Sequence, residues 1–231
     1  MDDYTLKHRM VFMNTNETYE NNIGRPYIES NGTVHYSVYG VTTTQQIKWL
    51  VDEAFNMLGK TDWEVSLFSH ICPYSDKNES DKSEFHGYGE DYPELRKITK
   101  AFKEGKSVDI MYPVVDTGTH EWKEMHLSKD FAQQGAIKVT GWYAGHVHDD
   151  CHRKVDGIDV AVSTCVKADC RTSWKNDPTP TKLPPKRNNT DLAMSINVFI
   201  INKDTRKVNV VKVGSKRNNA DKNSSDYEFT Y

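Results

Sequence analysis

Gly141-Trp-Tyr-Ala-Gly-His-Val-His-Asp-Asp150 joins the end of an apolar run to a pair of histidines. Residues 137–143 are apolar enough to predict a strand that enters the core. We expect the strand to break at Gly145, where the missing side chain lets the backbone and a ligand approach closely. His146 and His148 follow, and in an extended segment this spacing points both imidazoles the same way. Two neutral imidazoles at a buried strand end predict a site for a divalent transition metal.

A third histidine, His70, ends the segment at residues 62–70, which also predicts a strand. Strand ends can share one edge of an α/β sheet, where such folds place their ligand sites. We therefore expect His70 to join His146 and His148 as a metal ligand, while any one of them alone could be an ordinary loop residue. Asp149 and Asp150 either orient a ligand histidine or are solvated acids of a turn. The histidines predicted to be simple surface residues are His86, His120, His126 and His152.

Bulk composition sets limits on the class of protein. The chain has 231 residues and predicts one large domain rather than two small ones. Its net charge of -3 gives no signature for nucleic-acid binding. It shows no signal peptide and no apolar run of membrane-spanning length, so we expect a soluble protein, cytoplasmic or associated with a virion. A Gly-rich phosphate loop and a GxSxG motif are both missing, which argues against nucleotide-dependent and serine-hydrolase chemistry.

The four cysteines, Cys72, Cys151, Cys165 and Cys170, have no paired CxxC spacing, which argues against a zinc ribbon. We expect free thiols, with a bridge between Cys165 and Cys170 as the alternative. Charged or Pro-rich composition predicts exposed loops at residues 74–91 and 171–190.

Hydrophobic periodicity predicts several strands and two amphipathic helices. The first helix opens with a Thr cap followed by Gln46, presents an apolar face as far as Leu58 and stops at Gly59. The second helix covers residues 93–102. Residues 107–134 are mixed, and Val108, Ile110 and Val114-Val115 suggest a short strand there. Further strands are predicted at residues 9–14, 195–202 and 207–213, the last two forming a hairpin, and residues 155–166 predict a turn at Asp156-Gly157 followed by a strand. This mixture predicts an α/β or α+β sandwich.

Part of this pattern resembles the C-terminal half of a calcineurin-like metallophosphoesterase of the bacterial and phage type. The resemblance is carried by Phe68-Ser-His70, by Gly145-His-Val-His148 with the turn and strand that follow, and by the helix at residues 43–50. Residues 131–157 and 197–214 agree with it as well, so that it covers roughly residues 5–214. It implies an α/β fold that forms the C-terminal part of a two-sheet, four-layer sandwich with flanking helices. Residues 1–214 would form this domain, and residues 215–231 a polar tail whose aromatic end docks.

The resemblance also implies a chemistry. His70 and His146 would bind one metal and His148 the other, with Mn, Fe, Zn or Ni as the cation. Such a two-metal site clamps a phosphomonoester or phosphodiester while an activated water attacks phosphorus in line. The family's Asp-x-His motif lies upstream of the histidines quoted above, and no Asp-x-His occurs there in this sequence; Gly-Asp-x-x-Asp and Gly-Asn-His do not occur in it at all. The resemblance therefore implies a complementary N-terminal chain that carries them, and a chain that is inactive on its own.

Two other hypotheses stay open. The chain could be an inactive remnant that serves as a structural or binding module, for instance within a phage particle. Alternatively, His70, His146 and His148 could converge on a single cation with an open position for water, as in some zinc hydrolases. The sequence does not identify the phosphate-ester substrate, because one fold hosts many activities.

Overall fold

The computed structural model describes residues 1–15, 26–28, 34–36, 42–73, 92–115, 122–145, 151–163, 195–214 and 226–231. Several sequence predictions lie outside these ranges. They concern His86, His120, His146, His148, Asp149, Asp150, Cys165, Cys170 and the loops at residues 74–91 and 171–190.

A six-stranded sheet, called the main sheet below, lies in the middle of the fold. Its order is β1-β2-β5-β8-β10-β9, in which β2, β5, β8 and β10 are parallel and the edge strands β1 and β9 are antiparallel to their neighbours. The predicted strands around residues 9–14, 62–70 and 137–143 are confirmed, and so is the turn followed by a strand that was predicted to begin at Val155, as far as Ser163, where the described range ends. Parallel strands covered on both faces read as apolar runs. The bounds are β1 Asp2–Asp3, β2 His8–Met13, β5 Glu64–Ser69, β8 Lys138–Ala144, β9 Cys151–Val155 and β10 Ile158–Val162.

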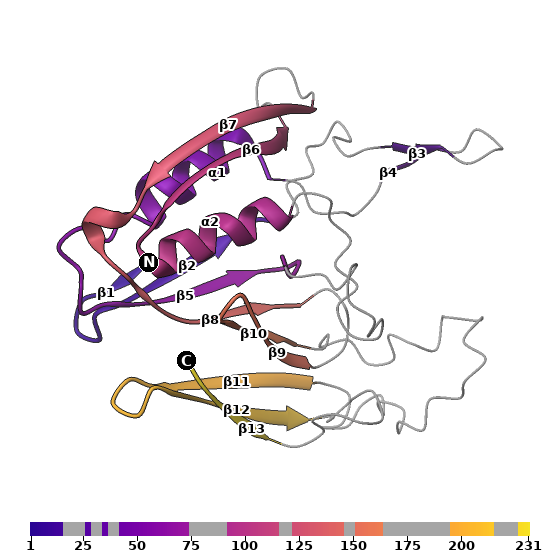
Figure 1. Ribbon diagram of the computed structural model, residues 1–231. Helices are drawn as coiled ribbons and strands as arrows, with labels where there is room; N and C mark the ends of the chain where they lie inside the picture. The colour runs from indigo at the N-terminus through magenta and orange to yellow at the C-terminus, as the bar shows by residue number, and fades with distance from the viewer. Residues whose placement is uncertain are drawn as a thin grey trace.

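Two helices cover one face of the main sheet (Figure 1). They are α1, Thr44–Trp49, which continues as a π-helical turn at Leu50–Ala54, and α2, Tyr92–Glu104. The predicted Thr cap is confirmed, because the Thr43 side chain accepts a hydrogen bond from the Gln46 N–H. The predicted extension to Leu58 is wrong: the helical segment ends at Ala54, and Leu58 is 57% exposed while Met57 is buried.

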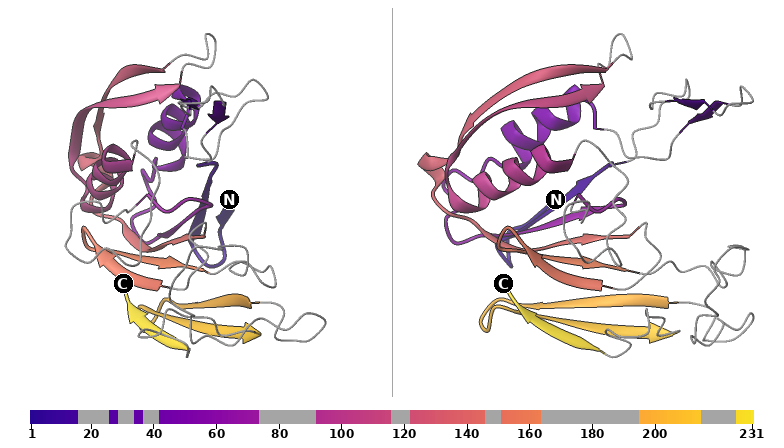
Figure 2. Two further views of the ribbon diagram at one scale, coloured as in Figure 1. Left: turned by 90° about the vertical axis from the view of Figure 1, so that its right-hand side faces the viewer. Right: turned by 45° about the vertical axis from the view of Figure 1, so that its right-hand side comes forward.

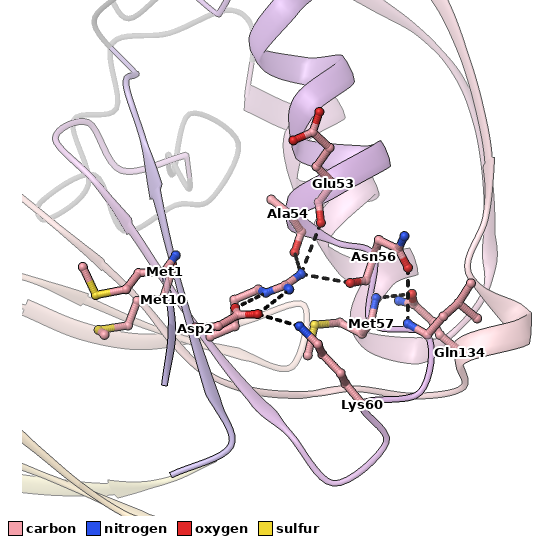
Figure 3. A network of polar contacts seen from close by, with 11 residues as sticks. Met1, Asp2, Met10, Glu53, Ala54, Asn56, Met57, Lys60 and Gln134 are labelled. Atoms are coloured by element: carbon pink, nitrogen blue, oxygen red, sulfur yellow. Dashed lines mark hydrogen bonds and ion pairs between the residues drawn. The ribbon is translucent and has the colours of Figure 1, made fainter. Parts of the chain in front are cut away.

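Arg9 of β2 explains why the helical segment ends at Ala54. The last carbonyl oxygens of a helix have no intrahelical partners. The Arg9 guanidinium donates to two of them, those of Glu53 and Ala54, at 3.2 and 2.9 Å, and to the oxygen of Asn56 just beyond the helix at 2.9 Å. Asp2 accepts two hydrogen bonds from the same guanidinium at 2.6 and 2.8 Å, and a further one from Lys60 (Figure 3). These charge-assisted bonds hold the pKa of the Asp2 carboxyl well below its usual range.

A second sheet packs on the opposite face of the main sheet from the helices (Figure 2). Its order is β11-β12-β13, with bounds Ser195–Asn202, Lys207–Gly214 and Tyr227–Thr230. The predicted hairpin and the docking of the aromatic C-terminal end are both confirmed, since β13 pairs with β12. The Tyr231 hydroxyl then donates to the Glu64 carboxylate of the main sheet at 2.8 Å. The described chain is therefore a mixed α/β fold in which strands predominate.

Two antiparallel hairpins complete the described elements. One pairs β6, Ser107–Val115, with β7, Trp122–Asp130, and lies beside the helices (Figure 1). The other pairs β3, Pro26–Ile28, with β4, Val34–Tyr36. The strand suggested by Val108, Ile110 and Val114-Val115 is confirmed as β6, but β7 was not predicted, because it is long and carries few apolar residues. A 3-10 turn at Ala132–Gln134 leads from this hairpin toward β8. None of the helices in the described ranges has the length and apolar character needed to cross a bilayer.

His152 departs from its prediction as a surface loop residue. It lies on β9, where its Nε2 is 3.1 Å from an Asp159 carboxylate oxygen that is buried. Its ring also stacks on Phe229 of the second sheet, with 4.3 Å between ring centroids. The turn at Asp156 and Gly157, where both φ angles are positive, brings β9 back along β10 and makes this contact possible.

Candidate functional site

The four parallel strands of the main sheet end at one edge. Thr15 follows β2, His70 follows β5, Gly145 follows β8 and Ser163 follows β10. In open α/β sheets, ligands bind outside these carboxyl ends. This edge is therefore the place in the fold where His70 can take part in a functional site.

His70 and Gly145 are directly bonded neighbours at this edge. The Gly145 N–H donates to the His70 carbonyl oxygen at 2.9 Å, and a Cβ added to Gly145 would lie 4.0 Å from His70 Nδ1. Gly145 immediately precedes His146-Val-His148, so the segment carrying this histidine pair begins beside His70. The side chains of His146 and His148 lie outside the described residues.

The backbone on both sides of His70 is fixed by polar contacts. The Ser69 hydroxyl accepts from the Trp142 indole N–H and donates to the Ile71 carbonyl oxygen, both at 2.7 Å. The Ile71 N–H donates to the hydroxyl of Thr15 at 2.9 Å, and Thr15 is fully buried. The His70 side chain itself is exposed. Sequence reasoning missed the supporting roles of Thr15 and Trp142; the polar pair Asn14-Thr15 at the end of an apolar strand is the signal for Thr15.

The end of β2 is fixed in a similar way by Gln46 of α1. Its side-chain amide accepts from the Asn14 N–H at 2.7 Å and donates to the Asn14 carbonyl oxygen at 2.8 Å. One side chain thus supplies both hydrogen bonds that a neighbouring strand would otherwise make to this residue. Gln46 therefore holds the loop after β2 against the helix.

A hollow of about 400 Å³ opens beside His70, on the side of the main sheet that faces the second sheet. Aromatic rings from neighbouring strands line it: Phe12 stacks on Phe68 at 4.7 Å, Phe68 on Tyr143 at 5.2 Å, and Tyr143 contacts Phe199 at 4.6 Å. We call it the aromatic hollow. Phe12, the last ring of the row, is 56% exposed. Burial raises the pKa of Tyr143 far above its usual value, so its phenol stays neutral.

His70 has the chemistry that a metal site needs, because an imidazole at an exposed strand end can offer a neutral nitrogen ligand. Within the part of the chain that the structure describes, no group of three or more His, Cys, Asp or Glu side chains is placed to hold a metal. The described residues thus contribute one predicted ligand. The metal site itself remains a prediction that involves His146 and His148, with Asp149 and Asp150 as residues that could orient them.

Comparison with known proteins adds no relative. No family model matches the chain, and neither a curated protein nor a solved structure matches it. Its function therefore has to be argued from the residues and the geometry of this edge.

Proposed function

We propose that this chain supplies the histidine ligands of a metal-dependent phosphoesterase. His70 and His146 bind one cation and His148 the other in this proposal. The observation that carries it is the hydrogen bond between Gly145 and His70, because it joins the two strand ends that precede the predicted ligands. Neutral imidazoles at the carboxyl edge of parallel strands suit Mn, Fe, Zn or Ni.

The chain's own residues have a positioning role in this proposal. The bonds around Ser69, Ile71 and Thr15 hold the His70 backbone in place before any ligand arrives, so little reorganisation accompanies binding. Asp149 and Asp150 follow the histidine pair directly and would accept its second ring N–H groups. Bound cations would supply positive charge for a phosphoryl group and lower the pKa of the attacking water.

The proposal requires carboxylates that this sequence does not offer in the family's motifs. Three neutral histidines would hold two dications poorly, because nothing would offset the repulsion between the cations. We therefore propose that a complementary N-terminal chain brings the Asp-x-His, Gly-Asp and Gly-Asn-His motifs. Together the two would form a four-layer sandwich, of which the helices, the main sheet and the second sheet are the described layers.

A binding or structural module without catalysis is the second candidate. One observation favours it: Ile196, Val198 and Ile200 form an exposed apolar row on β11, which is a feature of interaction surfaces. Such a row would serve an assembly role whether or not a metal binds nearby.

Hydrolysis of bis(p-nitrophenyl) phosphate distinguishes the phosphoesterase from the binding module. The chain is co-expressed with a phosphoesterase N-terminal half that carries the three motifs, and Mn²⁺ is added to the purified pair. The phosphoesterase proposal predicts hydrolysis that needs both chains and is lost with His146→Ala and His148→Ala. The control is His126→Ala, an exposed histidine paired with Asp109 on the distant hairpin. A pair that forms but shows no metal-dependent hydrolysis would favour the binding module.

A further inference from the structure

Among the strands that the structure describes, β11 is an edge strand, and it lacks the usual protection against pairing. It stands at one end of the order β11-β12-β13. Its sequence, Ser195-Ile-Asn-Val-Phe-Ile-Ile-Asn202, contains no charged residue and no proline, and it pairs with β12 over all eight residues without a bulge. Natural edge strands normally carry charges, prolines or bulges that discourage another strand from adding. β11 is therefore built like an interior strand.

Both faces of β11 carry apolar side chains. Ile196, Val198 and Ile200 point outward and are 42%, 43% and 51% exposed. Phe199 and Ile201 point inward and pack with Tyr143 of the main sheet. Strands that are apolar on both faces are typical of sheets covered on both sides.

The side of β11 that pairs with no described strand faces the aromatic hollow. β13 packs over β9 through Phe229 and His152, which places the free edge of β11 toward the other end of the main sheet. Below that edge the main sheet continues from Tyr143 to Phe68 and then to Phe12. Neighbouring strands lie about 4.8 Å apart, so one strand added to β11 would lie over Phe68 and reach the exposed ring of Phe12.

We propose that β11 is the docking edge for an uncharged, extended segment of the complementary chain. The segment adds to the second sheet as a further strand, and its inward-facing apolar side chains fill the aromatic hollow. Because the hollow also borders His70, the segment passes beside the predicted metal site. This inference rests on the proposed function for the identity of the partner, but the pairing chemistry belongs to β11 itself. Main-chain bonds at the edge would give affinity, and the hollow would select the side chains.

A second copy of this chain does not fit the same edge. β5 and β2 extend beyond β11 within the layer of the main sheet. Two copies joined edge to edge at β11 would drive these strands into the same space. A single strand that enters the hollow avoids this overlap.

The edge of the main sheet at β1 and β2 is less suitable than β11 for the addition of a strand. At Met10 of β2, both the N–H and the carbonyl oxygen bond to Met1, each at 2.8 Å. At Asn14, Gln46 makes the equivalent two bonds. The chain thus caps the edge of β2 from within, and β11 is the better place for a partner strand.

Binding of a neutral peptide probe tests this inference without metal or ester. The probe is a fluorescein-labelled peptide that alternates Thr with Val and Phe, titrated with the full chain in the presence of EDTA. Ile200→Lys places a charge on the edge strand, and we expect it to weaken peptide binding about tenfold. Val213→Lys is the matched control, because Val213 is equally exposed, at 51%, on the same outer face but on the inner strand β12. Phe12→Ala removes the ring at the far side of the hollow and should also weaken binding.

Thermal unfolding checks that all three variants fold. Equal peptide affinity for wild type, Ile200→Lys and Phe12→Ala would overturn the proposal that β11 is a docking edge. A wild-type chain that does not bind the peptide would overturn it as well. Because the titration contains no metal, failure of the phosphoesterase proposal leaves its result unchanged. Peptide binding together with absent hydrolysis would keep the docking edge and reject the catalytic role.

Discussion

The Gly145 N–H donates to the carbonyl oxygen of His70 across 2.9 Å, although 75 positions separate the two residues in the sequence. The bond forms because β5 and β8 are adjacent, parallel and end at the same edge. It brings the segment that begins with His146 next to His70, whose backbone is fixed by other bonds on both sides. The predictions below follow from the contacts that build this edge and from those that attach the sheets to each other.

Thr15 is expected to stabilise the turn that carries His70. Thr15→Val keeps the shape of the side chain but removes the oxygen that accepts the Ile71 N–H. A buried donor left without its acceptor costs about 1–3 kcal/mol of unfolding free energy. Urea unfolding measures the loss, and Thr5→Val at an exposed position is the control. Equal stability of the two variants would show that this bond does not hold the turn.

Gln46 is expected to matter more than its neighbour in the same helix. Gln46→Ala removes both hydrogen bonds to Asn14 and should lower the free energy of unfolding by about 2 kcal/mol. Gln45 is exposed, so Gln45→Ala should change stability by less than about 0.5 kcal/mol. Denaturant titration of the two variants in parallel makes the comparison. If Gln46→Ala is as stable as Gln45→Ala, the two bonds from Gln46 to Asn14 do not stabilise the fold.

Asp2 predicts a pH dependence of stability. Its pKa is lowered in the folded state by Arg9 and then Lys60, so its ionised form stabilises the fold. This contribution is fully present above the pKa of an unfolded Asp, about 3.9, and is lost as pH falls toward the lower folded value. Asp2→Asn should cost about 1 kcal/mol at pH 7, because the pair with Arg9 is only partly buried and solvent still screens it. The difference in unfolding free energy between this variant and wild type should shrink below about pH 4. A difference that stays constant down to about pH 2 would show that ionisation of Asp2 does not stabilise the fold.

Tyr231 is expected to anchor the C-terminal strand. Tyr231→Phe removes the donor to Glu64, whose carboxylate is only 1% exposed, and should cost about 1–3 kcal/mol. Hydrogen exchange should also quicken in β13. Tyr4→Phe, at a ring that is 73% exposed, provides the control for loss of a hydroxyl group. If both variants unfold like wild type, the contact does not attach the second sheet to the main sheet.

Most of the main sheet could be predicted from sequence, because β2, β5 and β8 are apolar runs of strand length. The cap at Thr43 could also be predicted, since it depends on a partner three residues away. The helix end could not: the apolar pattern continues to Leu58, but Arg9 closes the helix at Ala54 from a distant strand. β7 could not be predicted from the sequence, because its outward residues are polar and few of its inward residues are apolar.

The candidate site, like the fold, could be predicted from the sequence only in part. Sequence alone predicts that His70 and the His146-Val-His148 segment follow strands, but their adjacency depends on the order of β5 and β8. The bond from Ile71 to Thr15 spans 56 residues and leaves no local signal. His152 reads as a loop residue because its strand is polar, and only the pairing of β9 with β10 brings it to Asp159. Long-range partners therefore account for what sequence reasoning missed.

Calorimetric titration of the purified chain with Zn²⁺ tests the central claim that His70, His146 and His148 bind metal. The wild-type chain should bind Zn²⁺ through these imidazoles. His70→Ala and His146→Ala should each weaken binding by at least about tenfold. His126→Ala, at an exposed histidine paired with Asp109, should leave the affinity unchanged. Zn²⁺ binding that is the same in His70→Ala, His146→Ala and wild type would contradict the account.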